Sequence, residues 1–138
     1  MPKKKITSLV WFRNNLRVID NLSLKKSVEN SDKVIGYINI DPNIIKSTSY
    51  GFKKTEKFRI KFLLESISDL KKQLDKINIS LIVKNEDFKS SINSVISKYK
   101  IDNIYIQKEW TRDELLEEDI IPSNVNLIKD FDQFLFSP

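Results

Sequence analysis

The chain has 138 residues, enough for one domain with a hydrophobic core, and its 40% hydrophobic and 31% charged content is typical of a globular protein. It contains no cysteine and no histidine, which excludes disulfides, thiolate or imidazole metal sites and Ser-His-Asp catalysis. Two glycines cannot form a glycine-rich phosphate loop, and the net charge of +5 is scattered, which is typical of solvated helices rather than a DNA-binding stripe.

The sequence also predicts where the protein resides. No apolar run approaches the roughly 18 residues that a membrane-spanning helix needs. Residues 1–5 lead directly into the first apolar segment, without the hydrophobic region of a secretory signal. We therefore expect a cytoplasmic protein with no membrane partner.

The first predicted element is a strand that is buried on both faces, as in a parallel sheet covered by helices. Its apolar run extends from Leu9 to Phe12 and is followed at once by Arg13, Asn14 and Asn15. These polar residues would lie at the carboxyl end of the strand, where open α/β sheets bind ligands.

A polar loop and a helix follow this strand. Asp20 is predicted to cap the helix, and Leu24 and Val28 would form its apolar face. Arg13 and Arg17 could bind a ligand in this loop or only pin the loop to neighbouring carboxylates, and the local pattern leaves both readings open.

Residues 33–40 are predicted to form a second strand that ends at Asp41-Pro42, and a polar loop follows over 43–54. Thr55 would cap a long helix. Steps of three and four between its apolar residues predict one seam that packs on the sheet. The seam consists of Ile60, Leu63, Ile67, Leu70, Leu74 and Ile77, widened by Phe58, Phe62 and Leu64.

The rest of the chain continues the alternation of strands and helices. Strands are predicted over 80–84, 103–107 and 125–131, and an acidic helix over 112–121. Asp87 would cap the helix between the third and fourth strands. The apolar face of that helix consists of Ile92, Val95, Ile96 and Tyr99.

Strict alternation predicts an α/β fold: a doubly wound, mostly parallel, Rossmann-like sheet of about five strands with helices on both faces. In such a sheet the first and fourth strands lie side by side where the winding reverses, and their carboxyl ends flank the ligand crevice. The candidate ligand-binding residues at these two ends are Arg13, Asn14, Gln107, Lys108 and Glu109.

Several motifs resemble a known family. The run Trp11 to Arg17, followed by Asp20-Asn21 and Leu24, resembles the WFRxDLRxxDNxxL signature of photolyases and cryptochromes. Residues 51–66 resemble the GFxKTGxxRxxFLLES segment of the cryptochrome-DASH branch, and residues 107–114 resemble its Lys-Glu and acidic stretch. Three positions depart from the family pattern, namely Asn15 for Asp, Glu56 for Gly, and Trp110 after the Lys-Glu pair.

The resemblance implies an antenna and scaffold role. In this family a helical domain binds FAD, which repairs pyrimidine dimers in DNA, and the α/β domain helps to hold an antenna, often methenyltetrahydrofolate. We accordingly expect an α/β domain over 1–131 and, over 132–138, the start of a connection to a helical flavin-binding domain. Deoxyribodipyrimidine photolyase (lyase) activity and DNA binding would then need that helical domain, and we expect the present chain to be inactive alone.

Glu109 matches the family position of the carboxylate that holds the pterin of the antenna. An ionised carboxylate can accept two parallel N–H groups from a pterin edge. Two roles therefore stay open for Glu109, since it could instead cap the next helix or pair with Lys108. For Lys108 and Gln107 a structural role is the stronger reading. For Trp11 and Trp110 packing in the core or at its rim is favoured over electron transfer.

Two other functions fit the sequence. The chain could be a stand-alone nucleotide-binding α/β module that uses helix N-termini in place of a glycine-rich loop. It could also be a non-catalytic fragment that packs on a partner through an apolar tail. That tail consists of Phe131, Phe134, Leu135 and Phe136.

Overall fold

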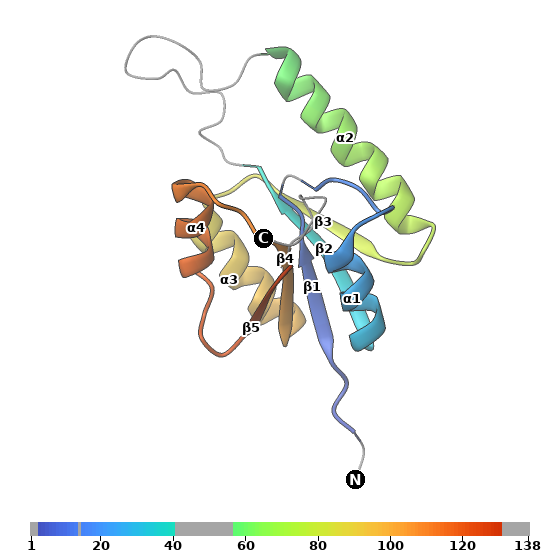
Figure 1. Cartoon of the computed structure of the whole chain (residues 1–138), viewed down its shortest axis with the longest axis vertical. Coiled ribbons are helices and arrows are strands. Elements are labelled where there is room, and N and C mark those ends of the chain that lie inside the picture. The colour runs from blue at the N-terminus through green and yellow to red at the C-terminus, as the bar shows by residue number, and fades with distance from the viewer. Residues whose placement is uncertain (1–2, 14, 41–56, 131–138) are drawn as a thin grey trace.

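The computed structural model describes residues 3–13, 15–40 and 57–130. Its five strands all pair in parallel and are arranged in the order β3-β2-β1-β4-β5 (Figure 1). The strands are β1 (Thr7–Trp11), β2 (Lys33–Asn39), β3 (Ser80–Lys84), β4 (Asn103–Gln107) and β5 (Asn126–Asp130). The helices are α1 (Leu22–Asn30), α2 (Lys57–Asp75), α3 (Phe88–Tyr99) and α4 (Arg112–Asp119). This is the doubly wound parallel sheet that the sequence predicts.

The central strand β1 is where the winding reverses. The chain adds β2 and β3 on one side of β1 and then returns to add β4 and β5 on the other side. Val10 pairs with Gly36 of β2 and with Tyr105 of β4, so β1 is hydrogen-bonded along both edges. The predicted neighbourhood of the first and fourth strands is therefore confirmed.

Two hydrophobic cores lie on opposite faces of the sheet, because successive side chains of a strand point to opposite faces. Leu9 and Trp11 belong to one core, which includes the apolar face of α3. Val10 and Phe12 belong to the other core, which α1 and α2 cover. All four of these side chains are at most 3% exposed, which accounts for the continuous apolar run in the sequence.

Gly36 lies at a close approach between β2 and the second core. A Cβ atom at this position would lie 3.1 Å from Leu81 Cδ1 and 3.2 Å from both Leu74 Cδ1 and Phe12 Cε2. Helix α2 therefore packs closely against the sheet at Gly36, where a larger residue would require Leu81, Leu74 and Phe12 to shift by a few tenths of an ångström.

The start of α1 differs from the prediction. Asn21, with an extended φ of −124°, is the N-cap, and its Oδ1 accepts a hydrogen bond from the Leu24 amide. Asp20 instead adopts a left-handed conformation with φ of 55°, which turns the chain into the helix one residue before the cap. Leu24 is buried as predicted, but Val28 is 50% exposed and was wrongly expected to be part of the core face.

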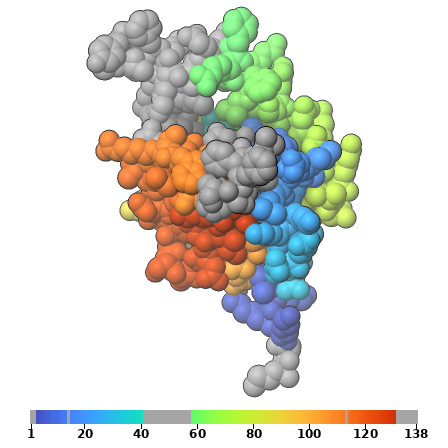
Figure 2. Space-filling view, viewed as in Figure 1, coloured from blue at the N-terminus to red at the C-terminus, as the bar shows by residue number. Residues whose placement is uncertain are grey.

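The fully buried side chains of α2 all lie in its second half. Ile67, Leu70 and Leu74 are buried, whereas Phe58 is 82% and Phe62 71% exposed. The green first turns of α2 project beyond the strands and stand out from the surface (Figures 1 and 2). Of the predicted seam, Ile60 and Leu63 are partly buried and Ile77 is exposed. The expected widening of the seam by Phe58, Phe62 and Leu64 is wrong, because all three side chains are exposed.

The remaining described elements follow the prediction closely. The Asp87 side chain caps α3 by accepting from the Ser90 amide, and Ile92, Val95 and Ile96 are buried. Helix α4 ends at Asp119, two residues earlier than expected, and β5 spans Asn126–Asp130. The predicted loop over 43–54, the Thr55 cap and the apolar tail over 131–136 lie outside the described residues. Within the described residues, no helix combines the length and apolar character needed to cross a bilayer.

Candidate functional site

The candidate site lies at the carboxyl ends of β1 and β4. Beyond β1, the Phe12 amide donates to the Tyr37 carbonyl at 2.8 Å, and beyond β4 the Lys108 amide donates to the Asp130 carbonyl at 2.8 Å. Both strand ends are therefore held by their outer neighbours, β2 and β5. The polar residues that follow them start from adjacent, fixed positions.

Gln107 and Glu109 form a buried polar pair at the end of β4. Each residue is 4% exposed, and Gln107 Nε2 donates a hydrogen bond of 3.2 Å to Glu109 Oε1. Within the described part of the chain, Gln107 Oε1 is buried without a hydrogen-bond partner. A buried acceptor of this kind costs about 1–3 kcal/mol unless a donor reaches it. The pair therefore presents acceptor oxygens that suit the N–H edge of a heterocycle.

The hydrogen bonds described for the Arg13 side chain are made with α4 and not with the Gln107–Glu109 pair. Its Nη1 lies 3.1 Å from Glu118 Oε1, and its Nη2 donates to the Glu114 carbonyl at 2.6 Å. The guanidinium carbon also lies 4.5 Å from the centre of the Trp11 ring. Of the two roles that the sequence left open for Arg13, these contacts support pinning the loop to a carboxylate. Asn14 lies outside the described residues.

The contacts of Arg13 belong to a continuous row of side chains, called the column below. It consists of Phe88, Trp11, Arg13, Glu118 and Lys129. On one side of Arg13, the Trp11 ring stacks on Phe88 with centroids 4.8 Å apart and an interplanar angle of 20°. On the other side, Glu118 also accepts from Lys129 Nζ at 2.9 Å. This column joins α3, β1, α4 and β5, and it fixes α4 beside the candidate site.

Asn15 is a buried residue of the loop that follows β1, and it is 1% exposed. Its Oδ1 accepts from the Arg13 amide at 3.2 Å, and its carbonyl accepts from the Arg17 amide at 2.7 Å. Among the described residues its Nδ2 has no hydrogen-bond partner. Arg17 Nε donates to the Asp20 carbonyl at 2.9 Å, so the contact described for this side chain closes the loop on its own backbone.

Lys108 and Trp110 lie on either side of Glu109 in sequence and contact each other. Lys108 Nζ is 5.0 Å from the centre of the Trp110 ring, and Trp110 is 49% exposed. Trp11 is 3% exposed and belongs to a core. The predicted packing role is therefore confirmed for Trp11, while Trp110 lies at the surface.

Sequence reasoning missed the residues that pair at long range. Glu118 is one of several carboxylates in a helix that is polar on most of its surface, so no periodicity marks it as buried. Asp130, 4% exposed, accepts from Lys26 Nζ at 2.6 Å and joins α1 to β5. A single buried carboxylate in an acidic helix and one at a strand end leave no signal in the sequence.

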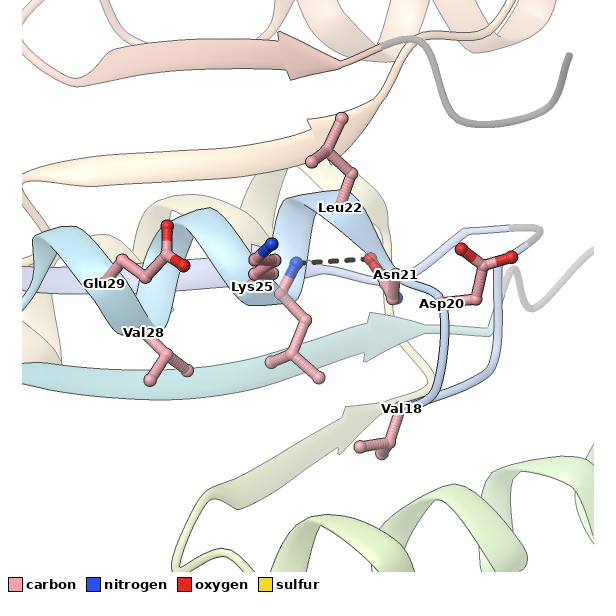
Figure 3. Close-up of a pocket in the computed structure, with 8 residues that line it drawn as sticks. Val18, Asp20, Asn21, Leu22, Lys25, Val28 and Glu29 are labelled. Atoms are coloured by element: carbon pink, nitrogen blue, oxygen red, sulfur yellow. Dashed lines mark hydrogen bonds between the residues drawn. The ribbon is translucent and has the colours of Figure 1, made fainter. Parts of the chain in front are cut away.

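A pocket of about 570 Å³ lies along α1 and the residues that precede it (Figure 3). Val18, Leu24 and Val28 contribute apolar lining, and Asp20, Asn21, Leu22, Lys25 and Glu29 complete it. A second pocket, of about 450 Å³, lies at the amino ends of β2 and β3 and shares Val28. Neither Gln107 nor Glu109 lines these two pockets.

Comparisons with known proteins identify the family of the chain. Residues 8–129 match the family model for DNA photolyase. Cryptochrome DASH of Solanum lycopersicum is 32% identical over 124 residues, which cover 89% of this chain and 22% of that protein. Deoxyribodipyrimidine photo-lyase of Buchnera aphidicola is 33% identical over an alignment that covers 94% of this chain and 28% of that protein.

Solved structures show the same fold. A cryptochrome of Synechocystis sp. PCC6803 superposes with a TM-score of 0.85 at 26% identity, over 95% of this chain and 28% of that one. An archaeal photolyase from Sulfolobus tokodaii has a TM-score of 0.77 at 22% identity, over 96% of this chain and 31% of that one, and supports the fold alone. The chain spans about a fifth of the length of its cryptochrome DASH relatives. It belongs to the DNA photolyase family and resembles the N-terminal α/β region of the cryptochrome DASH members, as its motifs predicted.

Proposed function

We propose that this chain is an antenna-binding and scaffold domain of a light-dependent flavoprotein, and that Gln107 and Glu109 hold the pterin edge of a folate antenna. The observation that carries the proposal is the buried Gln107–Glu109 pair, in which Gln107 Oε1 has no partner among the described residues. A pterin edge offers adjacent N–H donors, which an ionised carboxylate accepts with charge-assisted strength. The buried acceptors therefore fit methenyltetrahydrofolate in chemistry.

The roles within this proposal are divided between the chain and its cofactors. A bound folate antenna would absorb light and pass excitation energy to a flavin. FAD and a DNA lesion would be bound by a helical domain, as the family resemblance implies. The division of the chain at residue 131 and a cytoplasmic location stay predictions.

The nucleotide-binding alternative receives less support from the helix N-termini. Asn21 caps α1, and Asp87 caps α3. At α4, the Glu114 carboxylate accepts from the Thr111 amide at 3.3 Å. Amide groups that already bind side-chain oxygens are poor sites for a phosphate, and the carboxylates at α3 and α4 also repel it.

Calorimetric titration of methenyltetrahydrofolate into the 138-residue chain tests the proposal. We expect Glu109→Gln to weaken binding about tenfold, because an amide replaces the charged acceptor and leaves one pterin donor poorly paired, at a cost of roughly 1–3 kcal/mol. Glu86→Gln is the matched control, since Glu86 follows β3 at the same edge of the sheet and its side chain is 51% exposed.

Two results would contradict the proposal. Equal folate affinity of the wild type and Glu109→Gln would remove Glu109 from the site. No folate binding by the wild type, together with a thermal shift on addition of ATP, would instead support the nucleotide-binding module.

A further inference from the structure

Six lysines gather at the amino edge of the sheet, which is the edge opposite the candidate site. The segment that leads into β1 extends beyond the strands at this edge (Figures 1 and 2). Three of the lysines belong to this segment, one starts β2, and two lie at the end of α3. The six exposed residues, called the lysine cluster below, are Lys3, Lys4, Lys5, Lys33, Lys98 and Lys100. They are scattered in the sequence, so the fold brings them together.

Hydrogen bonds place the three segments of the lysine cluster beside one another. On one side of the N-terminal segment, the Lys33 amide donates to the Ile6 carbonyl at 3.1 Å. On the other side, the Asp102 amide donates to the Thr7 carbonyl at 2.8 Å, and Lys4 Nζ lies 2.9 Å from Asp102 Oδ1. The residues that follow α1 and α3 are therefore both tied to the segment that carries the first three lysines.

Tyr99 contacts lysines from two of these segments. Lys33 Nζ lies 6.0 Å and Lys98 Nζ 5.4 Å from the centre of the Tyr99 ring. Both distances are within the range of cation–π attraction. In the described part of the chain, neither Lys33 nor Lys98 forms an ion pair with a carboxylate. One aromatic ring therefore holds two ammonium groups whose charges are not neutralised by a bound carboxylate.

The carboxylates bonded to the N-terminal segment, Asp32 and Asp102, neutralise only part of the charge. They accept from the Ile6 amide at 2.7 Å and from the Thr7 amide at 3.0 Å. Asp102 also pairs with Lys4, whereas the other five lysines form no ion pair with any described residue. The negative end of α3 attracts the lysines at its own terminus, but it does not account for those that precede β1. An excess of positive charge therefore remains at this edge.

We propose that the lysine cluster binds the phosphate backbone of a nucleic acid, and that it does so independently of the candidate site at the opposite edge. Lysine recognises phosphate as a point charge, and each contact releases condensed counterions from the nucleic acid. Contacts of this kind position the protein without reading the base sequence.

An anionic membrane matches this surface less well. Proteins that lie on a membrane insert apolar side chains between the lipids in addition to their contacts with the headgroups. Among the described residues, none of the exposed large hydrophobic side chains lies within 3–6, 31–33 or 98–102. The lysine cluster therefore offers charge without an apolar anchor, which favours a nucleic acid as the partner.

Fluorescence anisotropy of labelled mixed-sequence oligonucleotides, titrated with the 138-residue chain, tests the proposal. Single-stranded and duplex oligonucleotides are measured separately between about 50 and 200 mM salt, and the form that binds more tightly identifies the source of the phosphates. We expect the double variant Lys33→Gln/Lys98→Gln to weaken binding about tenfold at the lower salt. It should also reduce the slope of log K against log salt by about 2, since two phosphate contacts are lost.

The matched control is the double variant Lys61→Gln/Lys89→Gln. It removes the same charge from two exposed lysines on α2 and α3 that lie outside the lysine cluster. We expect this variant to retain nearly all of the wild-type affinity and the wild-type salt slope. Circular dichroism of both double variants checks that the fold is retained, which we expect because all four side chains are exposed.

Three results would overturn the proposal. The first is no binding of either oligonucleotide by the wild type at about 50 mM salt. The second is an equal loss of affinity in the two double variants, because net charge rather than the lysine cluster would then drive binding. The third is binding to vesicles that contain phosphatidylserine without binding to oligonucleotides. The folate affinity of Lys33→Gln/Lys98→Gln should equal that of the wild type, so this proposal and the proposed function can fail separately.

Discussion

At the scale of single residues, the charges of Arg13 and Glu118 are removed from water together. Their side chains are 6% and 4% exposed and lie 3.1 Å apart. Burial of two charges is costly, and such a pair is favourable only while both partners are present. Lys129, the second partner of Glu118, is 38% exposed and can be hydrated when the carboxylate is lost. Arg13 has no such access to water.

We therefore predict that Glu118→Gln lowers the free energy of unfolding by about 3 kcal/mol, since it leaves the Arg13 guanidinium buried without a counter-charge. Urea denaturation followed by circular dichroism measures this loss. Glu86→Gln, which removes an exposed carboxylate 3.9 Å from Lys84, should cost less than about 0.5 kcal/mol. Similar losses in the two variants would contradict a special role for the buried pair.

Tyr37 is a second residue whose burial has a measurable consequence. Its side chain is fully buried, and its hydroxyl lies 2.8 Å from Ser91 Oγ. Burial raises the pKa of Tyr37 to about 12, because the charged phenolate is disfavoured away from water. The unfolded chain releases this proton near pH 10, about two pH units earlier than the folded protein. Stability from Tyr37 is therefore complete below pH 10 and is lost as the pH rises toward 12.

We predict that Tyr37→Phe reduces the alkaline loss of stability by about 2 kcal/mol between pH 9 and pH 11.5, the amount expected from the shifted pKa. At pH 7 the same variant should be less stable by about 1 kcal/mol, because the Ser91 hydroxyl loses its partner. Chemical denaturation at a series of pH values measures both effects. An alkaline loss of stability in Tyr37→Phe equal to that of the wild type would count against the assignment.

At the scale of elements, α2 shows what periodicity can and cannot predict. The steps of three and four correctly identified the face that carries Ile67, Leu70 and Leu74. They could not show where along its 19 residues the helix leaves the sheet, because that depends on the lengths of neighbouring strands. The predicted N-cap of α1 was wrong for a related reason. Asp20 adopts a left-handed conformation, which makes Asn21 the cap, and the local composition does not reveal this.

Because burial differs along α2, we predict that two substitutions in this helix have contrasting effects on the free energy of unfolding. Leu74→Ala should lower the free energy of unfolding by about 2–5 kcal/mol, because it leaves a cavity next to Gly36 and Leu81. Phe62→Ala removes a larger side chain but should cost less than about 0.5 kcal/mol, since Phe62 is 71% exposed. Thermal and urea denaturation measure both variants, and a loss for Phe62→Ala comparable to that for Leu74→Ala would show that this surface is covered.

At the scale of the whole molecule, the sheet order was predictable because the alternation of strands and helices leaves few topologies. Right-handed crossovers and a single reversal place the first strand beside the fourth, as observed. The partners of the polar residues at these strand ends were not predictable. Arg13 and Glu118 are 105 residues apart, and only the position of α4 beside Arg13 in the folded chain selects that carboxylate from its acidic neighbours. The positions of Gln107 and Glu109 thus followed from the sequence, while their burial and mutual hydrogen bond required the structure.

The central position of β1 in the sheet also affects how the chain folds during its synthesis. Ser8 pairs with Asn103, so at a synthesis rate of roughly 5–20 residues per second the first strand leaves the ribosome about 5–20 seconds before its second partner exists. During that interval one edge of β1 has unpaired backbone N–H and C=O groups. Such an edge can pair with a strand of another chain, which leads to aggregation. A nascent chain that stalls between α3 and β4 would therefore be prone to aggregate, and a chaperone that binds residues 7–11 would protect the strand on which the final sheet depends.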